Sequence, residues 1–203
     1  MPPLLLKEGS FVDTKEASVY SVKDTVKVTA RFVGNQELLK LTDSDWQNPF
    51  ASRSKSLYTV FELIVENSGQ DKISVDPNKC VLLDGLGHQY GALPDSFFKD
   101  LYPLTTAATI RKSQLTEEYQ AVYSYTDDYY RRNAADKSIF KPMDLFPGVK
   151  QKGFVVFESV GREAPVITLI FPGVITYKEN IEMKKMDFKF KFEQKVTIEQ
   201  VIQ

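Results

Sequence analysis

The sequence predicts a mostly β protein, an immunoglobulin-like antiparallel β-sandwich with a partly helical insertion. Several short segments alternate apolar and polar residues with a period of two, which is typical of half-buried strands. Gly, Pro, Asn and Asp separate these segments, as they do where a chain turns between strands. The regular helix–strand rhythm of a parallel sheet is missing. With 203 residues, the chain is expected to form one domain over 1–203, with the insertion at about 95–142.

The first part of the chain contains two expected strands joined by a long connection. Residues 19–33 alternate and end at the turn dipeptide Gly34-Asn35, with one apolar face made of Val26, Val28, Ala30 and Phe32. Residues 37–56 are polar and irregular, and Trp46 and Phe50 are interpreted as isolated apolar anchors within them. The next strand covers 57–66, and the side chains expected toward the core are Leu57, Phe61, Leu63 and Val65.

Residues 73–83 predict another strand, which is interrupted at Asp76-Pro77-Asn78. Proline cannot donate to a strand ladder, so the interruption marks an edge, a bulge or a switch between sheets. A tight turn at 84–87 and an extended path at Gln89-Tyr90 then predict a hairpin.

The pattern changes in the insertion. Residues 96–102 predict a short helix stopped by Pro103. Residues 113–135 predict a longer helix, because acidic residues lie in its first turn and Arg131-Arg132 in its last, which suits the helix dipole. A strand through 122–125 is the alternative, since Tyr and Val favour sheets.

Alternation returns near the C-terminus. Residues 154–157 and 166–171 are compact apolar runs bounded by Gly or Pro. In the last strand Phe188, Phe190 and Phe192 alternate with lysines, so one face should be buried and the other charged.

Two stretches share a pattern with a known family. The first combines an apolar strand at 58–69, a return strand at 73–75 and a leucine–acidic–small–x–Gly–x–x–Tyr pattern that ends at Tyr90. In the second, residues 145–158, a Pro-Gly turn, a basic stretch and Gly153 lead into a strand rich in Val and Phe.

Together these stretches resemble the immunoglobulin-like domains of unknown function found in bacterial and archaeal lipoproteins and other envelope proteins, a family sometimes mislabelled as telomeric repeat-binding. The resemblance covers residues 17–94 and 143–193. It implies an extracytoplasmic adhesion, scaffold or binding role and supplies no catalytic residues.

Composition and charge exclude several functions. Lys and Arg number 26 against 27 Asp and Glu, so neither nucleic acid nor an anionic membrane is an expected partner. No apolar run is long enough for a transmembrane segment. Cys80 lies in an apolar run and is expected to be buried. The protein is expected in the periplasm or at the cell surface if an export signal was removed, and otherwise in the cytoplasm; its oligomeric state is left open.

We expect no enzyme activity, cofactor or metal. His88 is the only histidine, and a lone His in a turn is expected to be solvated. The acidic pairs lack calcium-loop spacing, and Gly85-Leu86-Gly87 lacks the third Gly of a dinucleotide fingerprint. A carboxylate-dependent hydrolase would need a carboxylate pair that forms only in three dimensions, and it is the remote alternative.

The insertion is unusually rich in tyrosine and arginine, residue types that are enriched at recognition surfaces. Such a surface would bind a protein or a glycan, in a non-enzymatic module of the envelope or in a cytosolic interaction module of the same fold. The alternative is that these residues only pack the insertion on the sandwich. The candidate surface consists of Tyr119, Tyr123, Tyr125, Tyr129, Tyr130, Arg131 and Arg132.

Overall fold

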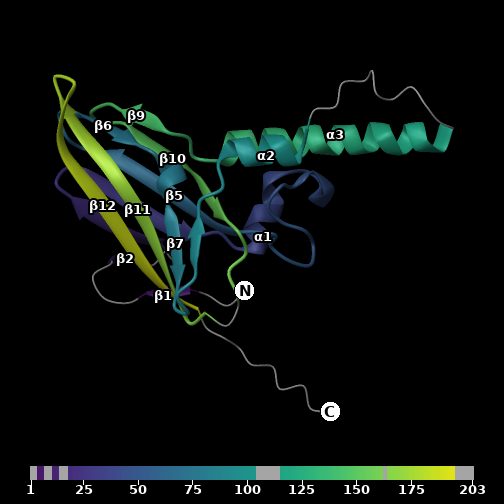
Figure 1. Ribbon diagram of the computed structural model, residues 1–203, viewed down its shortest axis with the longest axis horizontal. Helices are drawn as coiled ribbons and strands as arrows, with labels where there is room; N and C mark the ends of the chain where they lie inside the picture. Colours follow the sequence, from purple (N-terminus) through teal and green to yellow (C-terminus); the bar gives the residue numbers. More distant parts are fainter. Residues whose placement is uncertain (1–3, 7–10, 14–17, 104–114, 162–163, 195–203) are drawn as a thin grey trace, which may run out of the picture.

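Two antiparallel sheets account for most of the structure, a computed structural model that describes residues 4–6, 11–13, 18–103, 115–161 and 164–194 (Figure 1). The chain is therefore mostly β, and its sheets face each other across a common core as in a β-sandwich. Helices gather at one end of the sheets.

The smaller sheet has five strands in the order β10-β5-β4-β3-β2. Its strands are β2 (Phe11–Asp13), β3 (Ser18–Lys23), β4 (Val26–Phe32), β5 (Thr59–Asn67) and β10 (Lys150–Phe157). The prediction of one strand over 19–33 is wrong. A tight turn at Asp24, where φ is +52°, divides it into β3 and β4, which pair as a hairpin.

The larger sheet has seven strands. Five follow the order β1-β12-β11-β6-β9, while β7 also pairs with β11 and β8 pairs with β7. Its strands are β1 (Leu4–Leu6), β6 (Lys72–Val75), β7 (Val81–Asp84), β8 (Gln89–Gly91), β9 (Met143–Leu145), β11 (Val166–Lys178) and β12 (Ile181–Gln194). Both β6 and β7 pair with β11, so the predicted interruption is a break within one sheet, filled by the 3-10 turn η3 (Pro77–Lys79). The predicted hairpin is confirmed as β7 and β8.

The main core lies between the sheets, as period-two burial requires. Phe188, Phe190 and Phe192 are all buried on one face of β12, which confirms the predicted pattern. They pack with buried side chains of β4 and β5, among them Val28, Ala30, Phe61, Leu63 and Val65.

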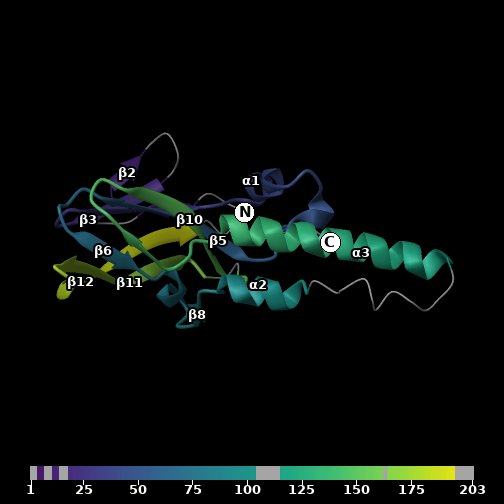
Figure 2. The ribbon, with the colours of Figure 1, turned by 90° about the horizontal axis from the view of Figure 1, so that it is seen from above.

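A second apolar cluster lies on the opposite face of the five-stranded sheet. It is at the end of the sheet where the helices gather (Figure 2). It buries Val60, Phe154 and Val156, whose side chains alternate with those of the main core. This explains why 154–157 reads as an unbroken apolar run: both of its faces are covered. A Cβ on Gly153 would lie 2.7 Å from the Cα of Phe140, so only glycine lets the chain after the long helix pass this close to β10.

Among the described residues, three helices and two 3-10 turns provide the cover. They are α1 (Asn35–Leu38), α2 (Asp95–Leu101) and α3 (Leu115–Ser138), with the 3-10 turns η1 (Leu39–Leu41) and η2 (Asp45–Gln47) between α1 and β5. The predicted short helix and the predicted longer helix are confirmed as α2 and α3, and the alternative strand at 122–125 is wrong. None of the helices in the described residues combines the length and apolar character that a membrane span requires.

The buried position of Cys80 is confirmed, and burial raises the pKa of its thiol far above the ordinary value, with the nearby charge of Asp76 adding to the effect. The native protein should therefore resist a thiol-specific disulfide reagent at neutral pH, while the denatured chain should react completely. Absorbance of the released thiolate measures both. Rapid stoichiometric reaction of the folded protein would contradict this placement.

Candidate functional site

The helical end brings the insertion together with the connection between β4 and β5. The later part of α3 contacts both α2 and η2, and its earlier part extends beyond the sheets (Figure 1). An ion pair of 3.2 Å joins Lys99 of α2 to Asp136 of α3, and Lys141 donates to the same carboxylate at 2.8 Å. These contacts fix the later part of α3 against the body of the protein.

Only part of the predicted Tyr/Arg surface falls where side chains are described. Tyr119, Tyr123 and Tyr125 belong to α3, but their side chains lie outside the described residues. Tyr129 and Tyr130 are 44% and 45% exposed, and their rings meet edge to face with centroids 5.7 Å apart. These two tyrosines therefore present aromatic surface to solvent at the point where α3 meets the body.

The two arginines of the predicted surface are less exposed than these tyrosines. Arg131 donates to Asp128 at 3.0 Å, and its guanidinium lies 5.5 Å from the ring centroid of Tyr102. Burial raises the pKa of Tyr102 to about 12, so its ring stays neutral beneath the cation. Arg131 thus has an internal role that ties α3 to the segment after α2, while Arg132 is half-buried.

Asn48 organises the connection that faces α3. Its buried amide donates to the carbonyl of Leu38 at 2.6 Å and accepts from the backbone N–H groups of Phe50 and Ala51. This residue is not among those predicted from the sequence. The only available signal was an asparagine before proline in a polar stretch, which is common in turns.

Trp46 and Phe50 behave oppositely, although the sequence suggested that both were anchors. Phe50 is fully buried and packs edge to face on Phe98 and Phe154. Trp46 is 70% exposed on the single turn η2, so the anchor prediction is wrong for this residue. Leu57, expected toward the core, is also exposed, because it precedes the first paired residue of β5.

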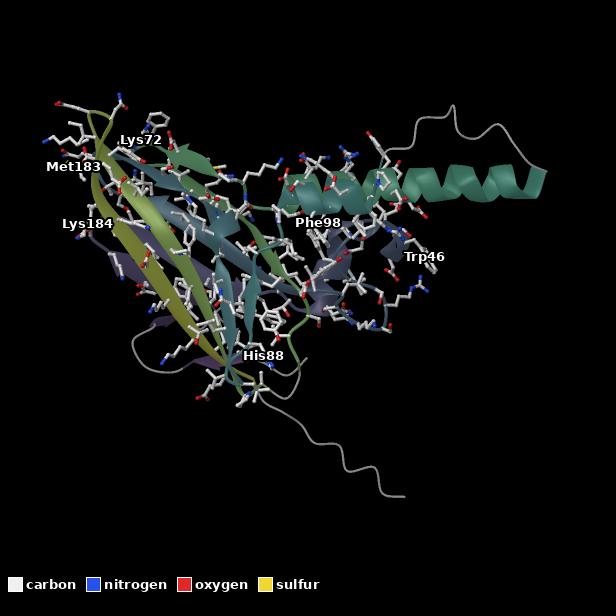
Figure 3. All side chains as sticks on the ribbon, in the orientation of Figure 1. Trp46, Lys72, His88, Phe98, Met183 and Lys184 are labelled. Atoms are coloured by element: carbon white, nitrogen blue, oxygen red, sulfur yellow. The ribbon has the colours of Figure 1, made fainter. Side chains whose placement is uncertain are left out.

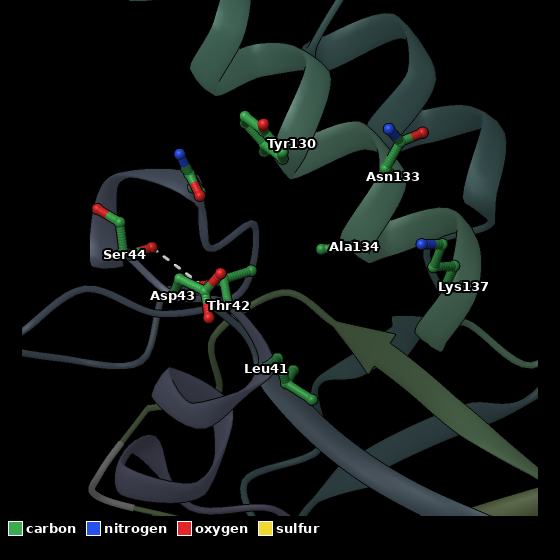
Figure 4. A pocket seen from close by; sticks show the side chains of 9 residues that line it. Leu41, Thr42, Asp43, Ser44, Tyr130, Asn133, Ala134 and Lys137 are labelled. Carbon is green, nitrogen blue, oxygen red and sulfur yellow. Dashed lines mark hydrogen bonds between the residues drawn. The ribbon is translucent and has the colours of Figure 1, made fainter.

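A hollow of about 470 Å³ opens between α3 and the connection (Figure 4). One wall comes from α3 and the other from residues 41–47, and Trp46 directly precedes a lining residue. Most of the lining residues have side chains with hydrogen-bonding groups: Thr42, Asp43, Ser44, Gln47, Tyr130, Asn133 and Lys137. Asp43 and Lys137 carry opposite charges, so the hollow has no strong preference for either sign of ligand.

The leucine–acidic–small–x–Gly–x–x–Tyr stretch is a turn device at a distance from the hollow (Figure 3). The Asp84 carboxylate accepts from the backbone N–H groups of Leu86 and His88 at 3.0 and 2.8 Å. It also lies 2.7 Å from His88 Nδ1 and accepts from the Tyr90 hydroxyl at 3.2 Å. The His88 side chain is 66% exposed, which confirms its predicted solvation.

Desolvation acts against the charge of Asp84, but the hydrogen bonds from His88 and Leu86 outweigh it and hold the pKa of this carboxyl below its ordinary value. Since the folded-state pKa is lower than that of the unfolded chain, about 4, the stabilisation is complete above that pH and is lost as pH falls through the folded pKa. Asp84→Asn should therefore lower the melting temperature at pH 7, and the difference from the parent should narrow below about pH 4. Asp71→Asn, at an exposed turn residue, is the control; a pH-independent deficit in Asp84→Asn would contradict the charge-based account.

Three other carboxylates are held in ion pairs that do not suit general acid catalysis. Hydrogen bonds from Arg31, Lys141 and Lys72 lower the pKa values of Glu37, Asp136 and Asp144, respectively. A general acid at neutral pH needs a raised value. Within the described ranges no group of three or more His, Cys, Asp or Glu side chains could hold a metal ion.

Comparisons with solved structures find remote likenesses, two of which are described below. No family model and no curated protein matches the chain. The yjhA protein from Bacillus subtilis is 12% identical, with a TM-score of 0.36, covering 75% of this chain and 76% of that one. A functionally unknown protein from Listeria monocytogenes EGD-e is 12% identical, with a TM-score of 0.38, covering 94% and 90%. Likenesses at this level support no inference about function.

Proposed function

We propose that this chain is an immunoglobulin-like, non-enzymatic binding module of the cell envelope that recognises its partner with the helical end. One observation carries the binding role: the exposed aromatic side chains of Trp46, Tyr129 and Tyr130 belong to the two elements, η2 and α3, that wall a hollow, and Tyr130 lines it. The envelope location and the immunoglobulin-like class follow from the family resemblance of residues 17–94 and 143–193.

Exposed aromatic side chains favour a recognition role over a packing role. Phe50 and Phe98, in the same part of the molecule, are fully buried, so the second cluster is already filled without Trp46 or the two tyrosines. Exposed aromatic rings lose unfavourable contact with water when a partner covers them, and they lose little conformational freedom because they have only two side-chain torsions. Such residues dominate binding energies at many interfaces.

The test compares the full chain with a variant in which Trp46, Tyr129 and Tyr130 are all replaced by alanine. Immobilised protein is exposed to cell-envelope extract and, separately, to cytosolic extract, and the retained components are quantified by mass spectrometry. We expect the parent to enrich an envelope component that the variant loses, while the free energy of unfolding changes by less than about 0.5 kcal/mol per substitution, as at other exposed positions.

A matched control replaces exposed apolar residues at the far end of the molecule, Ile181 and Met183, by alanine. These side chains are 65% and 61% exposed, and Figure 3 places Met183 opposite Trp46. The control should retain the same component as the parent. Equal retention by the aromatic variant, or a large loss of its stability, would instead favour packing as the role of these rings. Enrichment from cytosolic extract alone would favour the cytosolic interaction module.

A further inference from the structure

We infer that the hollow between α3 and residues 41–47 binds an oligosaccharide, with one sugar ring against Tyr130. This inference rests on the binding role proposed above and names the chemical class of the ligand.

The hollow has unused hydrogen-bonding groups on both of its walls. Asp43, Gln47, Asn133 and Lys137 line the hollow, and their side chains make no hydrogen bond or ion pair with any other described residue. Together they offer carboxylate acceptors, amide donors and acceptors, and an ammonium donor. A sugar hydroxyl both donates and accepts, so a polyol can use all of these groups at once.

Nearby polar side chains of the same types show that this is unusual at the helical end. The Asn48 amide forms hydrogen bonds with three backbone groups, and the Asn35 amide donates to the carbonyl of Ser52. Asp45 pairs with Arg53, and Asp136 with two lysines. The free groups thus belong to residues on both walls of the hollow.

The hollow also has an exposed aromatic surface. Tyr130 is half exposed at the hollow, and the edge-to-face contact with Tyr129 restrains its ring. The faces of aromatic rings carry partial negative charge, which complements the weakly positive C–H groups on the face of a sugar. Trp46 is exposed one residue before the lining residue Gln47, and we expect its ring to contact a second sugar of the bound oligosaccharide.

Size and charge argue against other ligands. The volume, about 470 Å³, lies within the range of small-molecule sites. A lipid or other apolar ligand would bury the free donors and acceptors without partners, at considerable cost. A nucleotide or another polyanion would meet one lysine opposed by one carboxylate, which gives no net attraction.

The experiment begins with the full chain on a printed array of microbial and mammalian oligosaccharides. Each retained oligosaccharide is then titrated in solution, and binding is followed by the fluorescence of Trp46, the chain's single tryptophan. We expect Gln47→Ala and Asn133→Ala each to weaken binding by up to about tenfold, the usual effect of one lost hydrogen bond. Tyr130→Ala should weaken it further, and added salt should have little effect because the ligand is neutral.

Gln36→Ala is the matched control, since Gln36 is exposed on α1 and does not line the hollow. It should bind like the parent. The inference is overturned if the array retains no oligosaccharide, or if Gln47→Ala and Asn133→Ala bind as tightly as Gln36→Ala. A different outcome is that the chain retains an envelope protein, with retention lost on replacing Trp46 and Tyr129 but not Gln47 or Asn133. That result would overturn the inference that the ligand is an oligosaccharide and leave the proposed binding role intact.

Discussion

Replacing Phe61 with alanine is expected to lower the free energy of unfolding by about 3–5 kcal/mol, the largest effect of any single change considered for this chain. Phe61 lies on β5, is fully buried, and has ring neighbours from both sheets. Its centroid is 5.8 Å from Phe32 and 6.3 Å from Phe157 in its own sheet, and 5.0 Å from Phe192 in the other. Truncation would open a cavity where the sheets meet.

Denaturant unfolding followed by circular dichroism measures this loss. Phe146→Ala is the matched control, because Phe146 is 62% exposed and its truncation should cost less than about 0.5 kcal/mol. Since small domains are stable by only about 5–15 kcal/mol, the Phe61 variant should be visibly less stable at room temperature. A cost below about 1 kcal/mol would mean that the interface between the sheets lies elsewhere.

Strand patterns were predictable wherever a strand buries one face along its whole length. Phe188, Phe190 and Phe192 lie on β12, where every second side chain is buried in the core. The local alternation of apolar and polar residues is therefore enough to predict this strand. The division between β3 and β4 was missed because its turn carries a single strong signal, Asp24, followed by Thr25, a residue type that favours strands. The second cluster could not be predicted, because burial on the second face of β10 depends on helices that are distant in sequence.

The candidate site was only half accessible to sequence reasoning. Tyr129 and Tyr130 were identified because clustered tyrosines are visible locally. The opposite wall, residues 41–47, is separated from them by more than 80 positions, and nothing local indicates that η2 contacts α3. Sequence could not distinguish Phe50 from Trp46 either, because both are aromatic residues in a polar segment. Phe50 is buried and Trp46 exposed because the turn that Asn48 holds by hydrogen bonds directs Phe50, and not Trp46, into the second cluster.

Asn48→Ala is therefore expected to have the second-largest effect. The substitution leaves the Leu38 carbonyl and the N–H groups of Phe50 and Ala51 without their buried partner. One unsatisfied buried group costs about 1–3 kcal/mol, and entry of water should limit the total to about 2–4 kcal/mol. The loss should be concentrated locally, because the main core between the sheets does not include this residue.

Hydrogen exchange measured by mass spectrometry can separate this local effect from general destabilisation. In Asn48→Ala, peptides from residues 35–56 should exchange faster, whereas peptides from β4 and β5 should keep their protection. Asn35→Ala is the matched control, since its longer bonds, 3.2 Å to Ser52 and 3.3 Å to Ser56, lie in a half-buried position. If exchange in 35–56 were unchanged by the loss of Asn48, that segment would be held by Phe50 packing alone. If the exchange rate of residues 35–56 rises as expected, the buried amide of Asn48 holds Trp46 and the 41–47 wall of the hollow in place. Asn48→Ala should then weaken ligand binding, although Asn48 itself does not line the hollow.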